Sequence, residues 1–141
     1  MSFDPAADYP LGQRRPDLVT TPSGLPLEEL TLEALRQGRL AAEDIRATPE
    51  TLARQSAVAQ AAGRAALAEN LARTGELATI PAETILEIYT ALRPHRSSAG
   101  ELEAWARRLE ELGAPLSAAF VREAAEVYAK RGLLAGEPAA V

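Results

Sequence analysis

Residues 81–98 read PAETILEIYTALRPHRSS and predict a helix with a defined start and a hard stop. Pro81 suits the first turn, where its fixed φ already fits a helix and the N–H that it lacks is not needed. Apolar side chains follow at helical spacing, namely Ile85, Ile88, Tyr89 and Leu92. Pro94 disfavours the α conformation at the preceding residue, so the helix ends at Arg93. Leu86 lies off the apolar stripe, which predicts that this helix is covered on more than one side.

A longer helix is predicted upstream of this one. Thr48 is an N-cap with Pro49 as the first helical residue, and the pattern continues to about Arg73. Gly75 is the predicted stop. The segment is rich in alanine, which keeps its helix propensity high and permits close approach of another helix. Gly63 costs about 1 kcal/mol relative to alanine in a helix interior, so it marks either a tight crossing point or a bend.

Two more helices are predicted after Pro94. Ser98 and Glu101 fit the Ser-x-x-Glu capping box, and apolar residues at helical spacing follow as far as Gly113. A last helix opens at Pro115 and closes at Gly132. No segment shows the alternation of a strand, so the fold class is all-α, with about four packed helices.

The N-terminal region has a different composition. Residues 1–26 contain half of the chain's ten prolines and predict an extended arm, followed by a short helix at residues 32–37. A disordered tail is the alternative. The apolar residues Tyr9, Leu11, Leu18, Val19, Leu25 and Leu27 favour an arm laid across a partner. We therefore expect a partner-docking arm at 1–26, a helical domain at 27–132 and a frayed tail at 133–141.

Composition excludes several classes of function. A net charge of −5 argues against nucleic acid as the main ligand, because phosphate neutralisation needs clustered cations. The absence of cysteine removes disulfide frameworks and thiolate chemistry. No apolar run approaches the roughly 20 residues that cross a bilayer, and no secretory signal is recognisable, so a cytoplasmic protein without membrane contact is expected. Aromatic residues make up only 4% of the chain, which suggests that a partner contributes to its stability.

The chemistry-bearing residues favour structural roles. His95 is the only histidine, and it fits a surface or interface position better than a base or a metal ligand. Arg93 and Arg96 suit partner carboxylates better than a free anion, because a helix C-terminus repels anions. The many glutamates suit a solvated helix face better than an acid/base pair. The aromatic residues Trp105, Tyr89, Phe120 and Tyr128 are predicted to be core rather than a stacking platform. We expect no catalytic, cofactor-binding or metal-binding residue in this chain.

Several blocks of the sequence carry a family resemblance. They are Asp8-Tyr9-Pro10-Leu11, Thr48-Pro49-Glu50-Thr51-Leu52, Ile85-Leu86-Glu87-Ile88-Tyr89, Ala91-Leu92-Arg93-Pro94 and Ala119-Phe120-Val121-Arg122-Glu123. In this order and spacing they resemble the small (gamma) subunit of adenosylcobalamin-dependent diol and glycerol dehydratases. The resemblance covers about residues 8–132.

The resemblance implies a subunit of a cobalamin-dependent carbon–oxygen lyase. Large (alpha), medium (beta) and small subunits would form a dimer of heterotrimers, with adenosylcobalamin between the large and medium subunits. The complex would convert 1,2-propanediol to propionaldehyde, or glycerol to 3-hydroxypropionaldehyde, with loss of water. The small subunit would stabilise the large one and be inactive alone, since the cofactor carries the chemistry.

Three departures from the family pattern refine this expectation. His95 stands where relatives tend to have an aromatic residue, and Gly75 falls where relatives look more strongly helical. The N-terminal region lacks the long extension associated with packaging in a bacterial microcompartment. This favours a glycerol-dehydratase-like complex that is cytoplasmic and not encapsulated.

The interface with the partner is expected at two places along the chain. The predicted contact residues are Tyr9, Pro10, Leu11, Leu18, Arg93, Pro94, His95 and Arg96. Two other functions stay open on the residues alone. One is a free-standing acidic helical adaptor or regulatory module, and the other is a small enzyme that uses paired glutamates.

Overall fold

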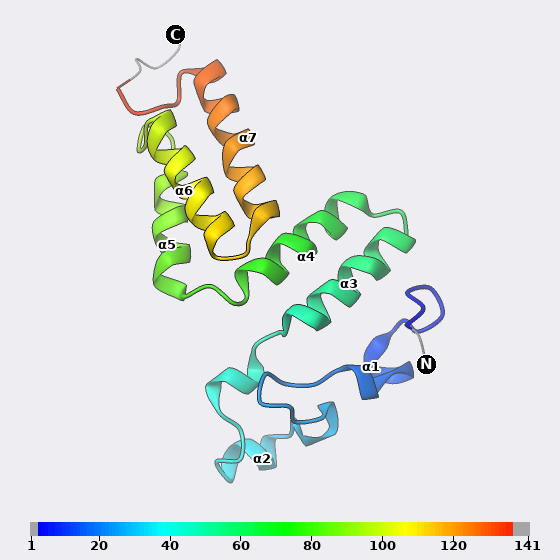
Figure 1. The fold of residues 1–141 in the computed structure, drawn as a ribbon. Helices are drawn as coiled ribbons and strands as arrows, with labels where there is room; N and C mark the ends of the chain where they lie inside the picture. The colour runs from blue at the N-terminus through cyan, green and yellow to red at the C-terminus, as the bar shows by residue number, and fades with distance from the viewer. Residues whose placement is uncertain (1–2, 137–141) are drawn as a thin grey trace. The chain divides into compact units, whose positions relative to one another are not determined.

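The computed structural model describes residues 3–136, which form helices joined by short turns (Figure 1). The α-helices are α1 (Leu11–Arg14), α2 (Leu32–Arg36), α3 (Pro49–Ala61), α4 (Ala65–Leu77), α5 (Ala82–Ala91), α6 (Ala99–Glu111) and α7 (Pro115–Arg131). The 3-10 turns are η1 (Pro16–Leu18), η2 (Leu27–Glu29) and η3 (Ala42–Ile45). Within residues 3–136 there is an isolated β-bridge between Thr20 and Pro26 but no strand, so the all-α prediction is confirmed.

The chain divides into two compact units, residues 1–78 and residues 79–141. We call them the N-terminal unit, which holds α1 to α4, and the C-terminal unit, which holds α5 to α7. The sequence predicts a different division, into a partner-docking arm, a helical domain and a frayed tail. The two compact units do not test docking or fraying, so this division stays a prediction.

The tail predicted at residues 133–141 is described only in part. Residues 137–141 lie outside the described residues. Before them, Leu134 is buried, and the N–H of Ala135 donates to the carbonyl oxygen of Ser97 at 2.9 Å. The chain as far as Ala135 is therefore held against the turn that precedes α6.

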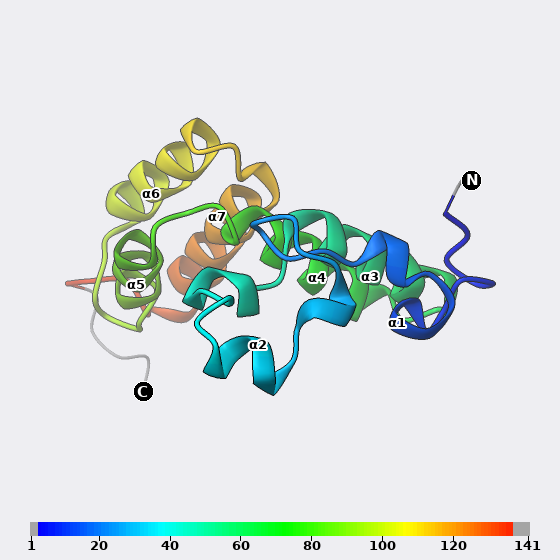
Figure 2. The same cartoon turned by 90° about the horizontal axis from the view of Figure 1, so that it is seen from below.

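The predicted helix from Pro49 to about Arg73 is two helices, so its continuity is wrong. Gly63 has a φ of +72°, a left-handed conformation that ends α3. The N–H of Arg64 donates back to the carbonyl oxygen of Ala59 at 2.8 Å. The chain then returns as α4, and the two helices lie side by side in both views (Figures 1 and 2). Of the two roles predicted for Gly63, the structure shows the bend.

Gly75 does not stop a helix, because α4 runs through it to Leu77. A Cβ at Gly75 would lie 3.7 Å from Cβ of Leu52 and 3.8 Å from the carbonyl oxygen of Pro49. Its missing side chain therefore suits the close approach of α4 to the start of α3. Further along, the hydroxyl of Ser56 donates to the carbonyl oxygen of Ala68 at 2.7 Å and joins the two helices.

The described part of the arm, residues 3–26, folds onto its own unit. Within residues 3–26 no helix exceeds the four residues of α1, as the prolines predict. Leu11 is buried, and Nη1 of Arg54 on α3 donates to the carbonyl oxygen of Leu18 at 2.6 Å. The described arm is therefore anchored to the helix hairpin. Docking of the arm on a partner stays a prediction.

The C-terminal unit matches the predicted helices closely. The capping box is present: the N–H of Glu101 donates to Oγ of Ser98 at 3.3 Å, and the N–H of Ser98 donates to Oε2 of Glu101 at 2.8 Å. Helix α5 is slightly shorter than predicted, because Pro81 is its N-cap and α5 ends at Ala91. The buried apolar residues of α6, of α7 and of the turn between them are Leu102, Ala106, Leu109, Ala114, Ala118 and Val121.

Part of the predicted aromatic core lies at the surface. Tyr89 is 60% exposed and Phe120 is 43% exposed, so the prediction that these two are core is wrong. Trp105 is half-buried, and the half-buried Tyr128 donates its hydroxyl to the carbonyl oxygen of Leu92 at 2.5 Å. Leu86 is also exposed, so α5 is not covered on that side within the chain. An apolar stripe identifies the hydrophobic face of a helix. It does not show whether that face packs within the same chain or against another subunit.

Candidate partner interface

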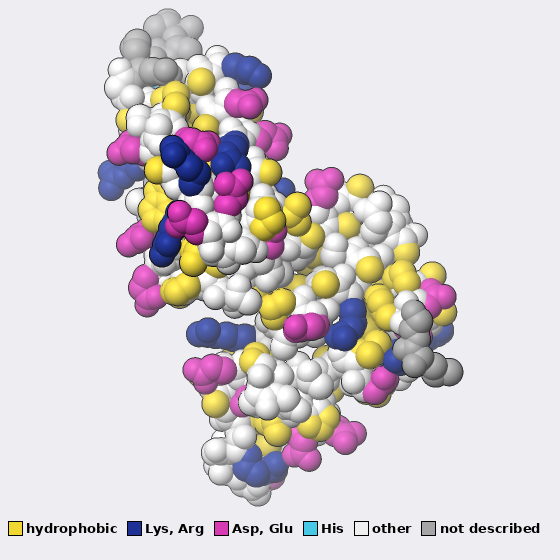
Figure 3. Space-filling model, viewed as in Figure 1, with side chains coloured by type: hydrophobic (Ala, Val, Ile, Leu, Met, Phe, Trp, Pro, Cys, Tyr) yellow, Lys and Arg dark blue, Asp and Glu magenta, His cyan; other side chains and the backbone are white. Residues whose placement is uncertain are grey.

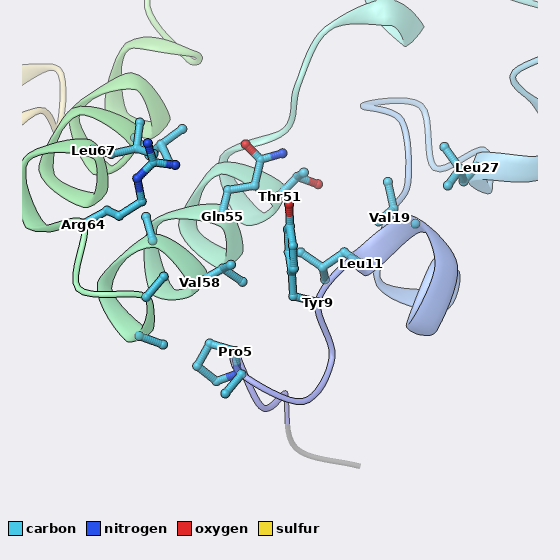
Figure 4. Close-up of a pocket in the computed structure, with 16 residues that line it drawn as sticks. Pro5, Tyr9, Leu11, Val19, Leu27, Thr51, Gln55, Val58, Arg64 and Leu67 are labelled. Carbon is cyan, nitrogen blue, oxygen red and sulfur yellow. The ribbon is translucent and has the colours of Figure 1, made fainter.

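The N-terminal unit carries a groove of about 820 Å³ between the arm and the α3–α4 hairpin (Figure 4). Its lining residues are Pro5, Ala6, Tyr9, Leu11, Gly12, Val19, Leu27, Thr51, Gln55, Val58, Ala59, Ala61, Ala62, Arg64, Leu67 and Leu71. We call it the arm groove. Most of these side chains are apolar, so the groove offers hydrophobic contact with few fixed polar partners.

Two arm residues on either side of Pro10 differ in their exposure to solvent. Leu11 begins α1 and is 8% exposed, whereas Tyr9 is 59% exposed. In the view of Figure 4, Tyr9 stands between the helix residues Gln55 and Val58 on one side and Val19 on the other. Leu11 therefore anchors the arm, and the ring of Tyr9 is left as part of the open groove wall.

Charged side chains fix the start of the arm. Nη1 of Arg15 lies 3.1 Å from Oδ2 of Asp8, and Nη2 of Arg15 lies 2.9 Å from Oδ2 of Asp17. The hydrogen bond from Arg15 holds the pKa of Asp17 below its ordinary value. These contacts hold the chain on both sides of α1, next to the groove wall.

A buried carboxylate fixes the end of the arm. Asp44 on η3 is 5% exposed, and it accepts hydrogen bonds from the hydroxyl of Ser23 and, at 2.9 Å, from the N–H of Ala41. Thr21 lies within hydrogen-bond distance of Ser23, and the N–H of Leu25 donates to Oγ1 of Thr21 at 3.0 Å. The pKa of Asp44 is lowered, chiefly by the hydrogen bond from Ser23. The ionised form of Asp44 thus ties the turn at residues 21–25 to the segment before α3.

Arg64 supplies a positive charge at one edge of the arm groove. It precedes α4, and its side chain is exposed. Within residues 3–136, the ion pairs do not include Arg64. The helix macrodipole adds positive potential at the same end of α4. This edge of the groove therefore favours a carboxylate.

The predicted basic turn lies in the C-terminal unit. Arg93, Pro94, His95 and Arg96 are all exposed. His95 has a φ of +59°, and its N–H donates to the carbonyl oxygen of Leu133 at 2.7 Å. Arg96 also lines a shallow hollow of about 370 Å³ with Leu86, Glu87, Thr90 and Ala91 of α5. This turn therefore adjoins apolar surface that the chain itself leaves open.

The eight predicted interface residues thus divide between the units. Tyr9 and Pro10 are exposed, Leu18 is half-buried, and Leu11 is packed inside its own unit. Their contact with a partner stays a prediction. The helix wall of the arm groove does not follow from the sequence pattern, because that pattern predicts one helix through Gly63. The left-handed preference of that glycine was the available signal.

Exposed apolar side chains also occur near α2. Leu32 is 74% exposed, Leu35 is 55% exposed and Ile45 is 75% exposed. Together with Tyr9, Leu86 and Tyr89 they put large apolar groups on the surface of both units. Such exposure is typical of surfaces that contact another protein.

Two acidic residues of α6 are held by an arginine of α7. Arg122 of α7 donates from Nε to Oε2 of Glu103 at 3.0 Å and from Nη1 to Oε1 of Glu110 at 2.6 Å. These hydrogen bonds lower the pKa of Glu103 and of Glu110. A glutamate that acts as a general acid needs a raised pKa. Glu103 and Glu110 therefore do not support the hypothesis of a small enzyme that uses paired glutamates. On the face of the C-terminal unit seen in Figure 3, positive and negative side chains are interspersed.

The described residues lack a cluster of the side chains that most often hold metal ions in proteins. No three histidine, cysteine, aspartate or glutamate residues within residues 3–136 lie together as a metal site would require. In the same part of the chain, no helix combines the length and the apolar composition needed to span a bilayer.

Comparison with known proteins identifies relatives along nearly the whole chain. The family described as dehydratase small subunit matches residues 5–135. The propanediol dehydratase small subunit of Citrobacter freundii is 47% identical over 131 residues, which cover 92% of this chain and 76% of that protein. The propanediol dehydratase small subunit of Salmonella typhimurium is 46% identical over 132 residues, covering 93% and 76%. These similarities confirm the resemblance drawn from the sequence blocks.

Proposed function

Because this chain belongs to the dehydratase small subunit family, we propose that it is the non-catalytic small subunit of a diol dehydratase. The observation that carries the proposal is the 47% identity to a propanediol dehydratase small subunit across 92% of the chain. The large apolar side chains exposed on both units support a role in assembly. In this role the chain contacts a larger subunit and stabilises it.

The reaction of the complex is the dehydration of a vicinal diol to an aldehyde. The names of both relatives support a propanediol as the substrate. We propose the 1,2-isomer, which would give propionaldehyde and water. Glycerol, which would give 3-hydroxypropionaldehyde and water, is the alternative substrate. A direct comparison of the two substrates with the assembled complex decides between them.

Adenosylcobalamin is the cofactor that we propose for the complex, where it supplies the radical chemistry. His95, the only histidine of the chain, sits on an exposed turn, which does not suit a residue that holds the cofactor in an enclosed site. We therefore place the cofactor between the large and medium subunits. The isolated chain accordingly has no turnover.

The proposed assembly is a dimer of heterotrimers with large, medium and small subunits. The arm and the turn from Arg93 to Arg96 are its proposed contact regions. We place it in the cytoplasm. Whether the complex is enclosed in a microcompartment is tested by its sedimentation in a cell lysate.

Co-expression tests the proposal against a free-standing adaptor. The chain is produced with and without the large and medium dehydratase subunits, and the native mass of the purified product is measured. Recovery of all three chains in equal amounts, with cobalamin-dependent dehydration, supports the small-subunit function. A chain that purifies as a monomer beside an assembled pair of larger subunits contradicts it.

A further inference from the structure

The arm groove is apolar on both walls and open to solvent in the described chain. The arm contributes Tyr9 and Val19, and the helix hairpin contributes Val58 and Leu67. Tyr9 is 59% exposed and Leu67 is 41% exposed, although Leu11 beside them is buried. Exposing large apolar groups to water costs free energy that docking would recover. The fixed arm therefore leaves the groove open rather than closing it.

The shape of the groove favours a segment of protein over a small molecule. Sites for small ligands are enclosed and bury most of the surface of the ligand. Here Tyr9 and Leu67 in the lining are exposed, so the groove does not enclose a small molecule in this way. The helix wall near the turn is made of small side chains, Ala59, Ala61 and Ala62. Short side chains at a contact permit a small distance between helix axes, so a helix fits this wall.

Arg64 defines the charge of the occupant. Its exposed guanidinium lines the groove, and no ion pair occupies it within residues 3–136. In Figure 4 its side chain lies beside Leu67, so charge and apolar surface adjoin on the same wall. A positive charge at this position attracts a carboxylate on the occupant. The occupant therefore combines an apolar stripe with an acidic residue at its edge.

We propose that the arm groove receives an amphipathic helix of the large dehydratase subunit, with apolar side chains against Tyr9 and Val58 and a carboxylate paired with Arg64. This inference rests on the proposed function for the identity of the partner. It differs from the contact regions expected from the sequence, because the α3–α4 hairpin supplies more than half of the lining residues. The arm acts as one wall of a groove and not as a free strap.

Two matched pairs of variants test the groove. Ala61 and Ala53 are both exposed alanines on α3, but only Ala61 lines the groove. Ala61→Trp places a large side chain in the groove. Ala53→Trp is its control, because it makes the same change in helix propensity and in exposed apolar surface outside the groove. Arg64→Glu reverses the charge, and Arg64→Lys retains it. Each full-length variant is titrated against the purified complex of large and medium subunits, with its circular dichroism measured in parallel.

We expect Ala61→Trp and Arg64→Glu to weaken binding at least about tenfold, which is the effect of about 1.4 kcal/mol. Ala53→Trp and Arg64→Lys bind within about twofold of the wild type. Equal binding by Ala61→Trp and Ala53→Trp overturns the inference. If Ala61→Trp lowers the thermal midpoint of unfolding, the two Arg64 variants test the inference instead. Equal binding by Arg64→Glu and Arg64→Lys then overturns the inference.

Other occupants give different results. A wild-type chain that dimerises alone, and loses the dimer on Ala61→Trp, shows that a second copy fills the groove and overturns the inference. Failure of the wild type to bind the larger subunits contradicts the proposed function itself. Binding by the wild type and by all four variants contradicts only the role of the groove.

Discussion

Nη1 of Arg54 on α3 donates a hydrogen bond to the carbonyl oxygen of Leu18 in the arm at 2.6 Å. This contact links residues 36 positions apart and holds the arm in place as a wall of the groove. Arg54→Ala should loosen the arm and cost about 1.5 to 3 kcal/mol, the usual worth of a hydrogen bond to a charged group. Hydrogen exchange of the amides at residues 9–25 should accelerate, with the exchange of α6 and α7 unchanged. Unaltered exchange in the arm would show that the contact does not hold it.

Asp44 makes the stability of the N-terminal unit depend on pH. Its pKa in the folded chain is lowered, chiefly by the hydrogen bond from Ser23. A lowered folded pKa contributes stability above the unfolded value of about 3.9, and this stability is lost as the pH falls through the folded pKa. We expect the wild type to lose more stability than Asp44→Ala when the pH is lowered from 6 to 3. Parallel pH curves for the two proteins would contradict this role of Asp44.

Arg122 joins α7 to α6 through Glu103 and Glu110. The network is partly exposed, so its contribution is reduced by solvent and by salt. Arg122→Ala should lower the thermal midpoint, and the loss should shrink in high salt. Arg107→Ala is the control, because its Nε lies 3.5 Å from Oε1 of Glu103 on the same helix. The control should have the smaller effect. Equal midpoints for both variants would refute a cross-helix role for Arg122.

Gly63 determines where α3 ends and α4 begins. An L side chain in the left-handed conformation of Gly63 costs roughly 1 to 2 kcal/mol, so Gly63→Ala should destabilise the N-terminal unit by about that amount. Gly100 in α6 has no atom within 4 Å of the Cβ it would gain. Gly100→Ala should therefore be neutral or stabilising by up to about 1 kcal/mol. Chemical denaturation of both variants measures the contrast. A stabilised Gly63→Ala would indicate one continuous helix.

Local signals in the sequence were sufficient for most helix ends. The proline at 81, the capping box at Ser98 and Glu101, and the glycines at 113 and 132 each act within one turn, so their chemistry can be read directly. The role of Gly63 is ambiguous in the sequence, because a glycine among alanines is compatible both with a bend and with a tight helix crossing. In the structure, the φ of +72° at Gly63 and the hydrogen bond from Ser56 to Ala68 show the bend.

The surface was harder to predict than the helices. Tyr89 and Phe120 lie on apolar stripes, yet they are exposed, because periodicity does not say whether a face is covered within the chain or by another subunit. The arm groove depends on contacts between distant segments, such as Arg54 with Leu18, which leave no local signature. For the same reason, Arg64 did not stand out among the arginines of the chain.

The most direct test of the central claim is the composition and activity of the complex purified after co-expression with the large and medium subunits. We expect all three chains in equal amounts, with cobalamin-dependent diol dehydration by the complex and no turnover by this chain alone. Purification of this chain as a separate monomer, or conversion of a diol by the isolated chain, would contradict the claim that it is a structural subunit.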